Sequence, residues 1–263
     1  MRAEKVFGYV GLGFFFLFPL VSLLQLRDTD DTWRQVAERV RPVIVSLHAN
    51  AGLVSDPATA PPPVACGVVL DRERLRIAVA GRAPAQVASL MPGGWVSWQT
   101  VYEDAAGDFA ILQASPGNGE ASTTAESGNA SVSGLQAARD AGVRLASNDS
   151  GDDISAALVG PAQLADMPIW VGVLTSAAGR SGRRTYHTDL LRPVLRAETV
   201  STAQAAGDIE ADLAPVLAGA PFVSRDGEIV ALYAGRRDGA AEAVPIGPIR
   251  EALAALDRQA SAQ

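Results

Sequence analysis

Hydrophobic residues follow three different patterns along the chain. An uncharged, largely apolar run occupies residues 6–26. Residues 32–41 instead carry apolar side chains at three- and four-residue spacings, which predicts a short amphipathic helix that Pro42 ends. From residue 43 onward, short β-branched runs alternate with turn residues, and this regular spacing predicts a β-barrel or a β-sandwich. The predicted strands are residues 43–49, 66–71, 75–80, 94–103, 109–115, 168–176, 221–224 and 228–234.

The first run has the length and composition of a membrane-spanning helix. It begins at Val6, ends at Leu26 and contains no charge over its 21 residues, which is enough to cross the hydrocarbon core. Arg2 and Lys5 precede it and aspartates follow it, so the positive-inside rule places residues 1–5 in the cytoplasm and the rest outside. A cleaved signal peptide is the alternative, but the sequence lacks the usual small-x-small cleavage site. We expect a retained single-pass anchor in the cell membrane, with the carboxyl-terminal domain in the periplasm if the cell is Gram-negative.

Two polar stretches divide the strand-rich region. Residues 55–65 and 115–134 are rich in Pro, Gly, Ser and Thr, which is typical of loops. Because several strands are predicted on each side of the second stretch, we interpret it as a linker between two β-barrels. The predicted organisation is a cytoplasmic tail (1–5), a transmembrane anchor (6–26), a first barrel with its leading helix (27–114), a flexible linker (115–140) and a second barrel with a C-terminal helix (141–263).

The last part of the sequence is predicted to be helical. Within residues 245–259, Ile249, Leu253 and Leu256 fall on one helical face. We expect this helix to dock its apolar face on the second barrel.

Composition narrows the possible functions. The chain has 263 residues, of which 48% are hydrophobic and 19% charged, as in folded proteins with a substantial core. Its net charge of −7 and its lack of clustered basic residues argue against a nucleic-acid partner. A single cysteine, Cys66, excludes an intrachain disulfide, and two histidines are too few for most histidine-rich metal sites. We therefore expect no cofactor and no metal.

Several motifs occur in order across the strand-rich region. Asp108 stands near the head of the segment GDFAIL at 107–112, and the segment APVLAGAPFV occupies 214–223. Together with four further segments, these motifs resemble the HtrA/DegP branch of the trypsin-like serine peptidases over roughly residues 33–257. The resemblance implies an all-β protein of two packed chymotrypsin-like barrels. The further segments are VAERVRPVIVSLHA (36–49), ACGVVL (65–70), the turn RDGE (225–228) and AVPI (243–246).

The resemblance also implies which residues occupy the catalytic positions. Gly81 falls where the family has its histidine, Asp108 where it has its aspartate, and Ala218 where it has its serine. Val216 replaces a glycine whose backbone amide helps to build the oxyanion hole in the family. Acyl transfer in this fold requires a nucleophile, a general base and a carboxylate that orients the base. Since the carboxylate alone remains, we expect no proteolysis.

Other reactive residues have simpler interpretations. Cys66 lies in an apolar strand, which favours a small buried side chain over a nucleophile. Asp108 without a neighbouring base is expected to be a relic rather than an acid or base in its own right. We expect His48 to be partly buried in the first strand and His187 to lie on the surface. Either histidine would bind a metal only with additional ligands.

Basic and aromatic residues leave alternatives open. Arg180, Arg183 and Arg184 lie in the glycine-containing segment GRSGRR, which is either a solvated loop or a site for a carboxylate or phosphate. Three tryptophans belong either to the core or to an interface, and they are Trp95, Trp98 and Trp170.

The expected function is a catalytically inactive, membrane-anchored domain that binds, scaffolds or assists a membrane protein complex. It would offer a peptide groove or a flat face to its partner, which is either the complex or peptide segments. The PDZ domain that commonly follows in the family is not expected, because few residues remain after the closing helix. Two alternatives are an active hydrolase with an unrecognised residue set and a regulator that competes for peptide substrates. An active-site probe tests the first, and binding of extended peptides tests the second.

Overall fold

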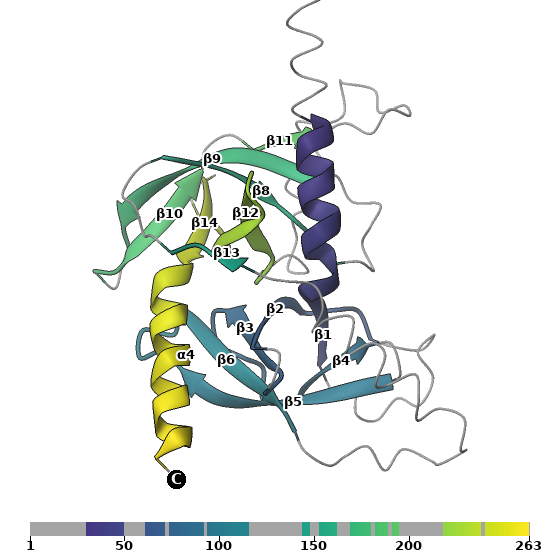
Figure 1. The fold of residues 1–263 in the computed structure, drawn as a ribbon, viewed down its shortest axis with the longest axis vertical. Coiled ribbons are helices and arrows are strands. Elements are labelled where there is room, and N and C mark those ends of the chain that lie inside the picture. The colour runs from purple at the N-terminus through teal and green to yellow at the C-terminus, as the bar shows by residue number, and fades with distance from the viewer. Residues whose placement is uncertain are drawn as a thin grey trace, which may run out of the picture.

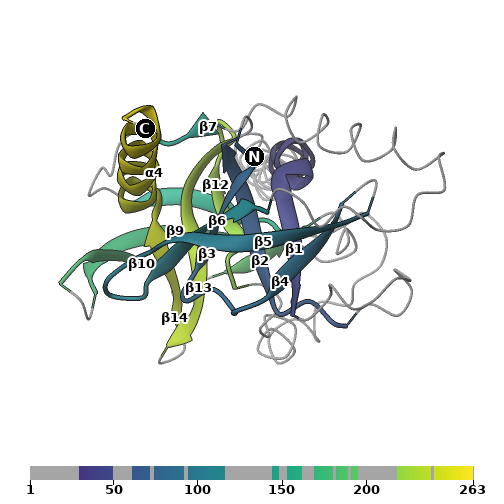
Figure 2. The same cartoon turned by 90° about the horizontal axis from the view of Figure 1, so that it is seen from below.

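A computed structural model shows two β-barrels stacked along the long axis of the molecule, each with a helix at its side (Figure 1). Figure 2 shows both helices along the same face of the barrels. Within the described part of the chain, no helix is long and apolar enough to cross a membrane. The predicted anchor at 6–26 and nearly all of the predicted linker at 115–140 lie outside that part. The structure describes residues 30–49, 61–71, 74–91, 94–115, 144–147, 153–161, 169–179, 182–188, 191–194, 218–237 and 240–262.

The first barrel is a closed ring of six antiparallel strands in the order β1-β2-β3-β6-β5-β4. A short 3-10 turn, η1 (Arg41–Val43), contains Pro42 and leads into β1. The end of β3 pairs with the start of β6, where Ala80 lies opposite Phe109. The strands are β1 (Ile44–Ala49), β2 (Ala65–Asp71), β3 (Arg76–Ala80), β4 (Val87–Met91), β5 (Gly94–Glu103) and β6 (Phe109–Ala114).

The second barrel closes in the same way. Its six main strands follow the order β8-β9-β10-β14-β13-β12, and β12 pairs with β8 to complete the ring. Two short strands add to its outside, because β11 pairs with β9 and β7 pairs with β13. The strands are β7 (Arg144–Leu145), β8 (Ile154–Leu158), β9 (Ile169–Ala178), β10 (Arg184–Thr188), β11 (Arg192–Val194), β12 (Pro221–Ser224), β13 (Glu228–Arg237) and β14 (Ala240–Pro245).

Both barrels therefore have one topology. If the six main strands of each are numbered along the chain, the ring order is 1-2-3-6-5-4 in both cases. The strand β3 of the first barrel contacts β13 of the second, and buried apolar residues form one cluster that extends through both barrels. The predicted mainly β architecture of two barrels with terminal helices is confirmed. Two six-stranded antiparallel barrels of this kind are consistent with a chymotrypsin-like fold.

Each terminal helix lies beside the barrel that is more distant in sequence. The N-terminal helix, residues 30–40, precedes the first barrel but lies beside the second (Figure 1). The C-terminal helix α4 (Ile246–Ser261) follows β14 and contacts β13, but it also contacts β6 of the first barrel. The helix predicted at 245–259 is confirmed. Its predicted docking on the second barrel is incomplete, because the later turns of α4 contact the first barrel.

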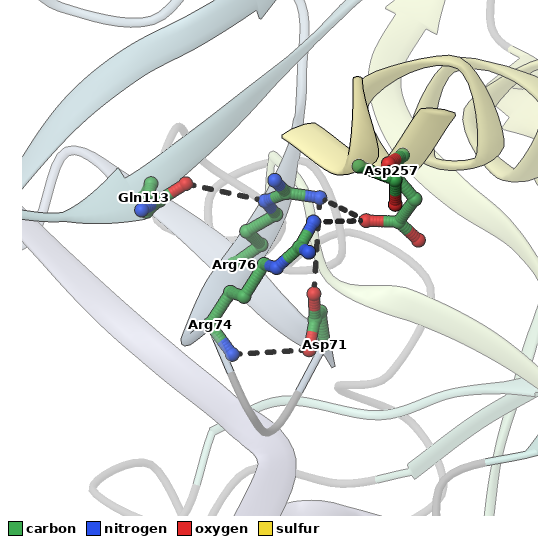
Figure 3. Close-up of polar contacts among 6 residues, drawn as sticks. Asp71, Arg74, Arg76, Gln113 and Asp257 are labelled. Atoms are coloured by element: carbon green, nitrogen blue, oxygen red, sulfur yellow. Dashed lines mark hydrogen bonds and ion pairs between the residues drawn. The ribbon is translucent and has the colours of Figure 1, made fainter. Parts of the chain in front are cut away.

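Figure 3 shows how α4 is attached to the first barrel. Asp257 accepts hydrogen bonds from Nη1 of Arg76 at 2.7 Å and from Nη1 of Arg74 at 2.8 Å. The Arg76 side chain is buried, and its Nε donates to Oε1 of Gln113 at 3.2 Å. Oδ2 of Asp71 lies 3.8 Å from Nη1 of the same arginine. A buried guanidinium that is shared by two carboxylates and an amide thus fixes the end of α4 to β2, β3 and β6.

Candidate functional site at the barrel junction

Gly81 and Asp108 are neighbours at the edge of the first barrel. The pairing of β3 with β6 places them side by side, and the Gly81 amide donates to the Asp108 carbonyl oxygen at 2.7 Å. Gly81 has φ +74°, a left-handed conformation that side chains rarely adopt. A Cβ at this position would meet no atom within 4 Å, so there is space beside it but backbone strain for any side chain.

Ala218 and Gly219 form the turn that enters β12, and they lie against the first barrel. The Ala218 carbonyl accepts a 2.7 Å hydrogen bond from the amide of Cys66, and the Gly219 amide donates to the carbonyl of Tyr233, also at 2.7 Å. Gly219 has φ +88°, and a Cβ there would lie 2.0 Å from the Cys66 carbonyl oxygen and 3.5 Å from the Ala80 amide nitrogen. The turn therefore lies between β2 and β13, beside the end of β3.

The three positions that the sequence resemblance singled out thus meet where the two barrels join. Gly81 directly follows Ala80, which borders the turn of Ala218, and Gly81 is hydrogen-bonded to Asp108. A hydrogen atom and a methyl group stand at the two positions expected for the base and the nucleophile. Val216, the expected oxyanion position, lies outside the described residues.

Sequence reasoning missed an ion pair beside this junction. Asp104, in the turn between β5 and β6, has a side chain that is 1% exposed, and its Oδ1 accepts a 2.6 Å hydrogen bond from Nη1 of Arg183. Its Oδ2 accepts a second bond from the Ala106 amide at 3.1 Å. Arg183 belongs to the hairpin between β9 and β10, so the pair joins the two barrels. Of the two alternatives that the sequence left open for this segment, a solvated loop does not describe Arg183, because its guanidinium pairs with a carboxylate of the same chain. Arg180 lies outside the described residues.

Cys66 has the environment of a structural residue. It is fully buried in β2 opposite Ser46 of β1, as the apolar strand predicted. Burial raises the pKa of the thiol from its usual 9.0 to about 12, because the low-dielectric interior disfavours the thiolate. The thiol is therefore protonated near neutral pH and lacks the reactivity of a catalytic cysteine.

This shift predicts a pH dependence of stability. Because the folded-state pKa is raised, the unfolded chain loses the thiol proton first as the pH increases above 9.0. The free energy of unfolding should then fall by up to about 1.4 kcal/mol per pH unit. Urea unfolding of the unmodified protein and of Cys66→Ala between about pH 8 and pH 10.5 measures the contribution of the thiol. All other titratable groups are common to both chains, so the difference between their pH slopes belongs to Cys66. Equal pH slopes in the two proteins would contradict it.

The two histidines have local partners. Nδ1 of His48 lies 2.6 Å from the carbonyl oxygen of Pro61, which requires that this nitrogen carry the proton, and the ring packs edge-on to Trp95. This partly buried position in β1 agrees with the sequence. His187 was expected on the surface but is half-buried in β10, where its Nε2 lies 3.3 Å from Oγ1 of Thr185.

Two of the three tryptophans belong to the core. Trp98 is 5% exposed and donates from Nε1 to Oγ of Ser89 at 2.8 Å, while Trp170 is 4% exposed. Among the residues that the structure describes, no three His, Cys, Asp or Glu side chains gather in a way that could hold a metal ion.

Comparisons with known proteins assign no family, since the chain matches no protein-family model and no curated protein. The structural evidence is therefore the topology itself. Two six-stranded antiparallel barrels share one strand order, and the turn of Ala218 and Gly219 connects them. The protein is a double β-barrel consistent with the chymotrypsin-like fold.

Proposed function

We propose that this chain is a membrane-anchored pseudoprotease, a chymotrypsin-like domain without hydrolytic activity that acts as a binding, scaffolding or accessory subunit of a membrane protein complex. The observation that carries the proposal is the barrel junction. Gly81 and Ala218 lie there, next to the backbone of Asp108 and Cys66, and the family resemblance assigns these two residues to the positions of the base and the nucleophile. Neither side chain can attack a carbonyl or accept a proton, and a carboxylate alone does not supply these steps.

The residues that could replace the missing groups are poorly suited to do so. The Cys66 thiol is buried and protonated near neutral pH, because its pKa is raised to about 12. Nδ1 of His48 is hydrogen-bonded to the carbonyl oxygen of Pro61, and His187 lies beside Thr185 within β10. These contacts favour a binding role over a hydrolase with an unrecognised residue set.

Restoring the nucleophile alone should not restore proteolysis. In Ala218→Ser the hydroxyl would have no imidazole to accept its proton, and a serine at its ordinary pKa is a weak nucleophile. The combination Gly81→His, Val216→Gly and Ala218→Ser supplies both groups, but a histidine in place of Gly81 would have to adopt φ +74°, which costs roughly 1–2 kcal/mol. We expect that the unmodified protein and Ala218→Ser both fail to hydrolyse casein and that a fluorophosphonate probe labels neither of them.

The assay needs an active trypsin-like peptidase as its positive control. Turnover by the unmodified protein that Asp108→Ala or Cys66→Ala removes would refute the pseudoprotease proposal and favour the hydrolase. The binding role is tested by purification from native membranes in detergent. Companions that remain at fixed stoichiometry through size-exclusion chromatography support a subunit role, and a chain that always purifies alone argues against it.

A further inference from the structure

The N-terminal helix is attached to the second barrel at its first two turns. Oδ1 of Asp30 accepts hydrogen bonds from both Nη1 and Nη2 of Arg192, each at 3.0 Å, and Arg192 begins β11. One turn later, the guanidinium of Arg225 lies 5.6 Å from the ring centroid of Trp33, within the range of a cation–π contact. Trp33 is 1% exposed, so the indole is also part of the core.

Apolar burial continues along the same helix. Val36 and Ala37 have no exposed surface, and Val40 is 6% exposed. If only the short turn η1 joined this helix to β1, the helix would be able to change its angle relative to the barrels. The Asp30–Arg192 pair and the Trp33–Arg225 contact join the helix to the second barrel, and the buried face of the helix packs into the core cluster that both barrels share.

The start of this helix lies at one end of the molecule. Figure 1, in which the longest axis is vertical, shows it near β11 at the top, while α4 ends at the bottom. The sequence predicts that the membrane span ends at Leu26, four residues before Asp30. A fully extended chain covers at most about 3.6 Å per residue, so Asp30 lies within about 14 Å of the end of the span. The headgroup region beyond the hydrocarbon core is itself roughly 5–8 Å thick on each side.

We propose that the β11 end of the second barrel faces the lipid headgroups, and that Asp30–Arg192 and Trp33–Arg225 fix this orientation. The proposal rests on the membrane attachment in the proposed function. The second barrel is then the membrane-proximal one, and the end of α4 points away from the bilayer. The barrel junction with Gly81 and Ala218 is held off the membrane by the second barrel, so a partner reaches it from the aqueous side.

Fluorescence quenching in proteoliposomes tests this orientation on the full-length chain. Gln35 and Gln259 are a matched pair of exposed glutamines on the N-terminal helix and on α4. Each is replaced singly by cysteine and labelled with a donor dye, while the buried Cys66 thiol stays unlabelled. The vesicles contain phosphatidylethanolamine, phosphatidylglycerol and a lipid with an acceptor on its headgroup. We expect quenching to be several-fold stronger at position 35 than at position 259.

The contacts that fix the orientation are tested in the same assay. Arg192→Ala combined with Arg225→Ala removes both polar attachments but leaves Trp33 and Val36 buried, so quenching at position 259 should increase yet stay below that at position 35. The absence of any increase in the double variant would overturn the role of these two contacts in the orientation. The matched control is Arg34→Ala, which removes an exposed pair with Asp31 inside the helix and should change nothing. If the protein stays in the membrane after carbonate extraction but quenching is equal at positions 35 and 259, the proposed orientation is overturned while the anchor stands. Release of the unmodified protein from membranes by carbonate would overturn both the orientation and the proposed anchor.

Discussion

Replacing Arg183 with alanine is expected to lower the free energy of unfolding by about 2–4 kcal/mol. The Asp104 side chain is 1% exposed, so the change leaves a buried carboxylate without its cation. Removal of one partner from a fully buried ion pair typically costs about 3–5 kcal/mol. The expected loss is lower here because Arg183 is 42% exposed, which lets water approach, and because the Ala106 amide still donates to Oδ2. Urea unfolding of the purified protein in detergent measures the change.

Arg184 provides the control for this prediction. It follows Arg183 in the sequence and is exposed, so Arg184→Ala should change stability by less than about 0.5 kcal/mol. Adding Asp104→Asn to Arg183→Ala should recover part of the lost stability, because a neutral amide costs less to bury than an unpaired carboxylate. Equal losses for Arg183→Ala and Arg184→Ala would show that the inter-barrel pair contributes little.

Gly219→Ala is expected to destabilise the fold by at least about 3 kcal/mol. The new Cβ would lie 2.0 Å from the Cys66 carbonyl oxygen, a backbone atom that no side-chain rotation can move away. Relief of this contact requires the turn to separate from β2, which breaks the bond from the Cys66 amide to the Ala218 carbonyl. A lost hydrogen bond of this type costs about 1 kcal/mol, overpacking about 1–3 kcal/mol, and left-handed backbone strain about 1–2 kcal/mol.

Gly227 separates the strain from the steric contact. It has φ +81°, close to the +88° of Gly219, but a Cβ at Gly227 would meet no atom within 4 Å. Gly227→Ala should therefore show the strain alone, about 1–2 kcal/mol. Thermal and urea unfolding of both variants compare the two effects. If Gly219→Ala is no more destabilising than Gly227→Ala, the turn does not hold the barrels together as the structure implies.

The local sequence predicted the strands that are rich in β-branched residues. The run at 94–103 coincides with β5, and the run at 43–49 includes all of β1, because β-branched and aromatic side chains fit a pleated strand whatever it pairs with. Strands β4, β7, β10 and β11 were not predicted from this pattern, and neither were β8 and β14. Their sequences, ISAAL and AAEAVP, are rich in alanine, which has low β-propensity, and pairing with neighbouring strands keeps them extended.

The family resemblance placed Asp108 and Ala218 shortly before two strands, and the structure has β6 and β12 there. Asp108 directly precedes β6, and Ala218 lies three residues before β12. The structure adds the backbone conformation. The positive φ of Gly81 and of Gly219 depends on how β3, β2 and β13 approach one another. The sequence shows that a glycine is present but not which neighbouring atom a side chain at that position would contact.

Tertiary structure alone decided the long-range polar contacts and the placement of the helices. Asp104 and Arg183 are 79 residues apart, and nothing near either residue marks it as the partner of the other. The same holds for Asp257 with Arg76 and for Asp30 with Arg192. Helical periodicity shows which face of a helix is apolar but not which barrel covers it. The sequence therefore predicted the strands that are rich in β-branched residues and the two terminal helices, whereas the packing of two closed barrels determined which helix lies on which barrel.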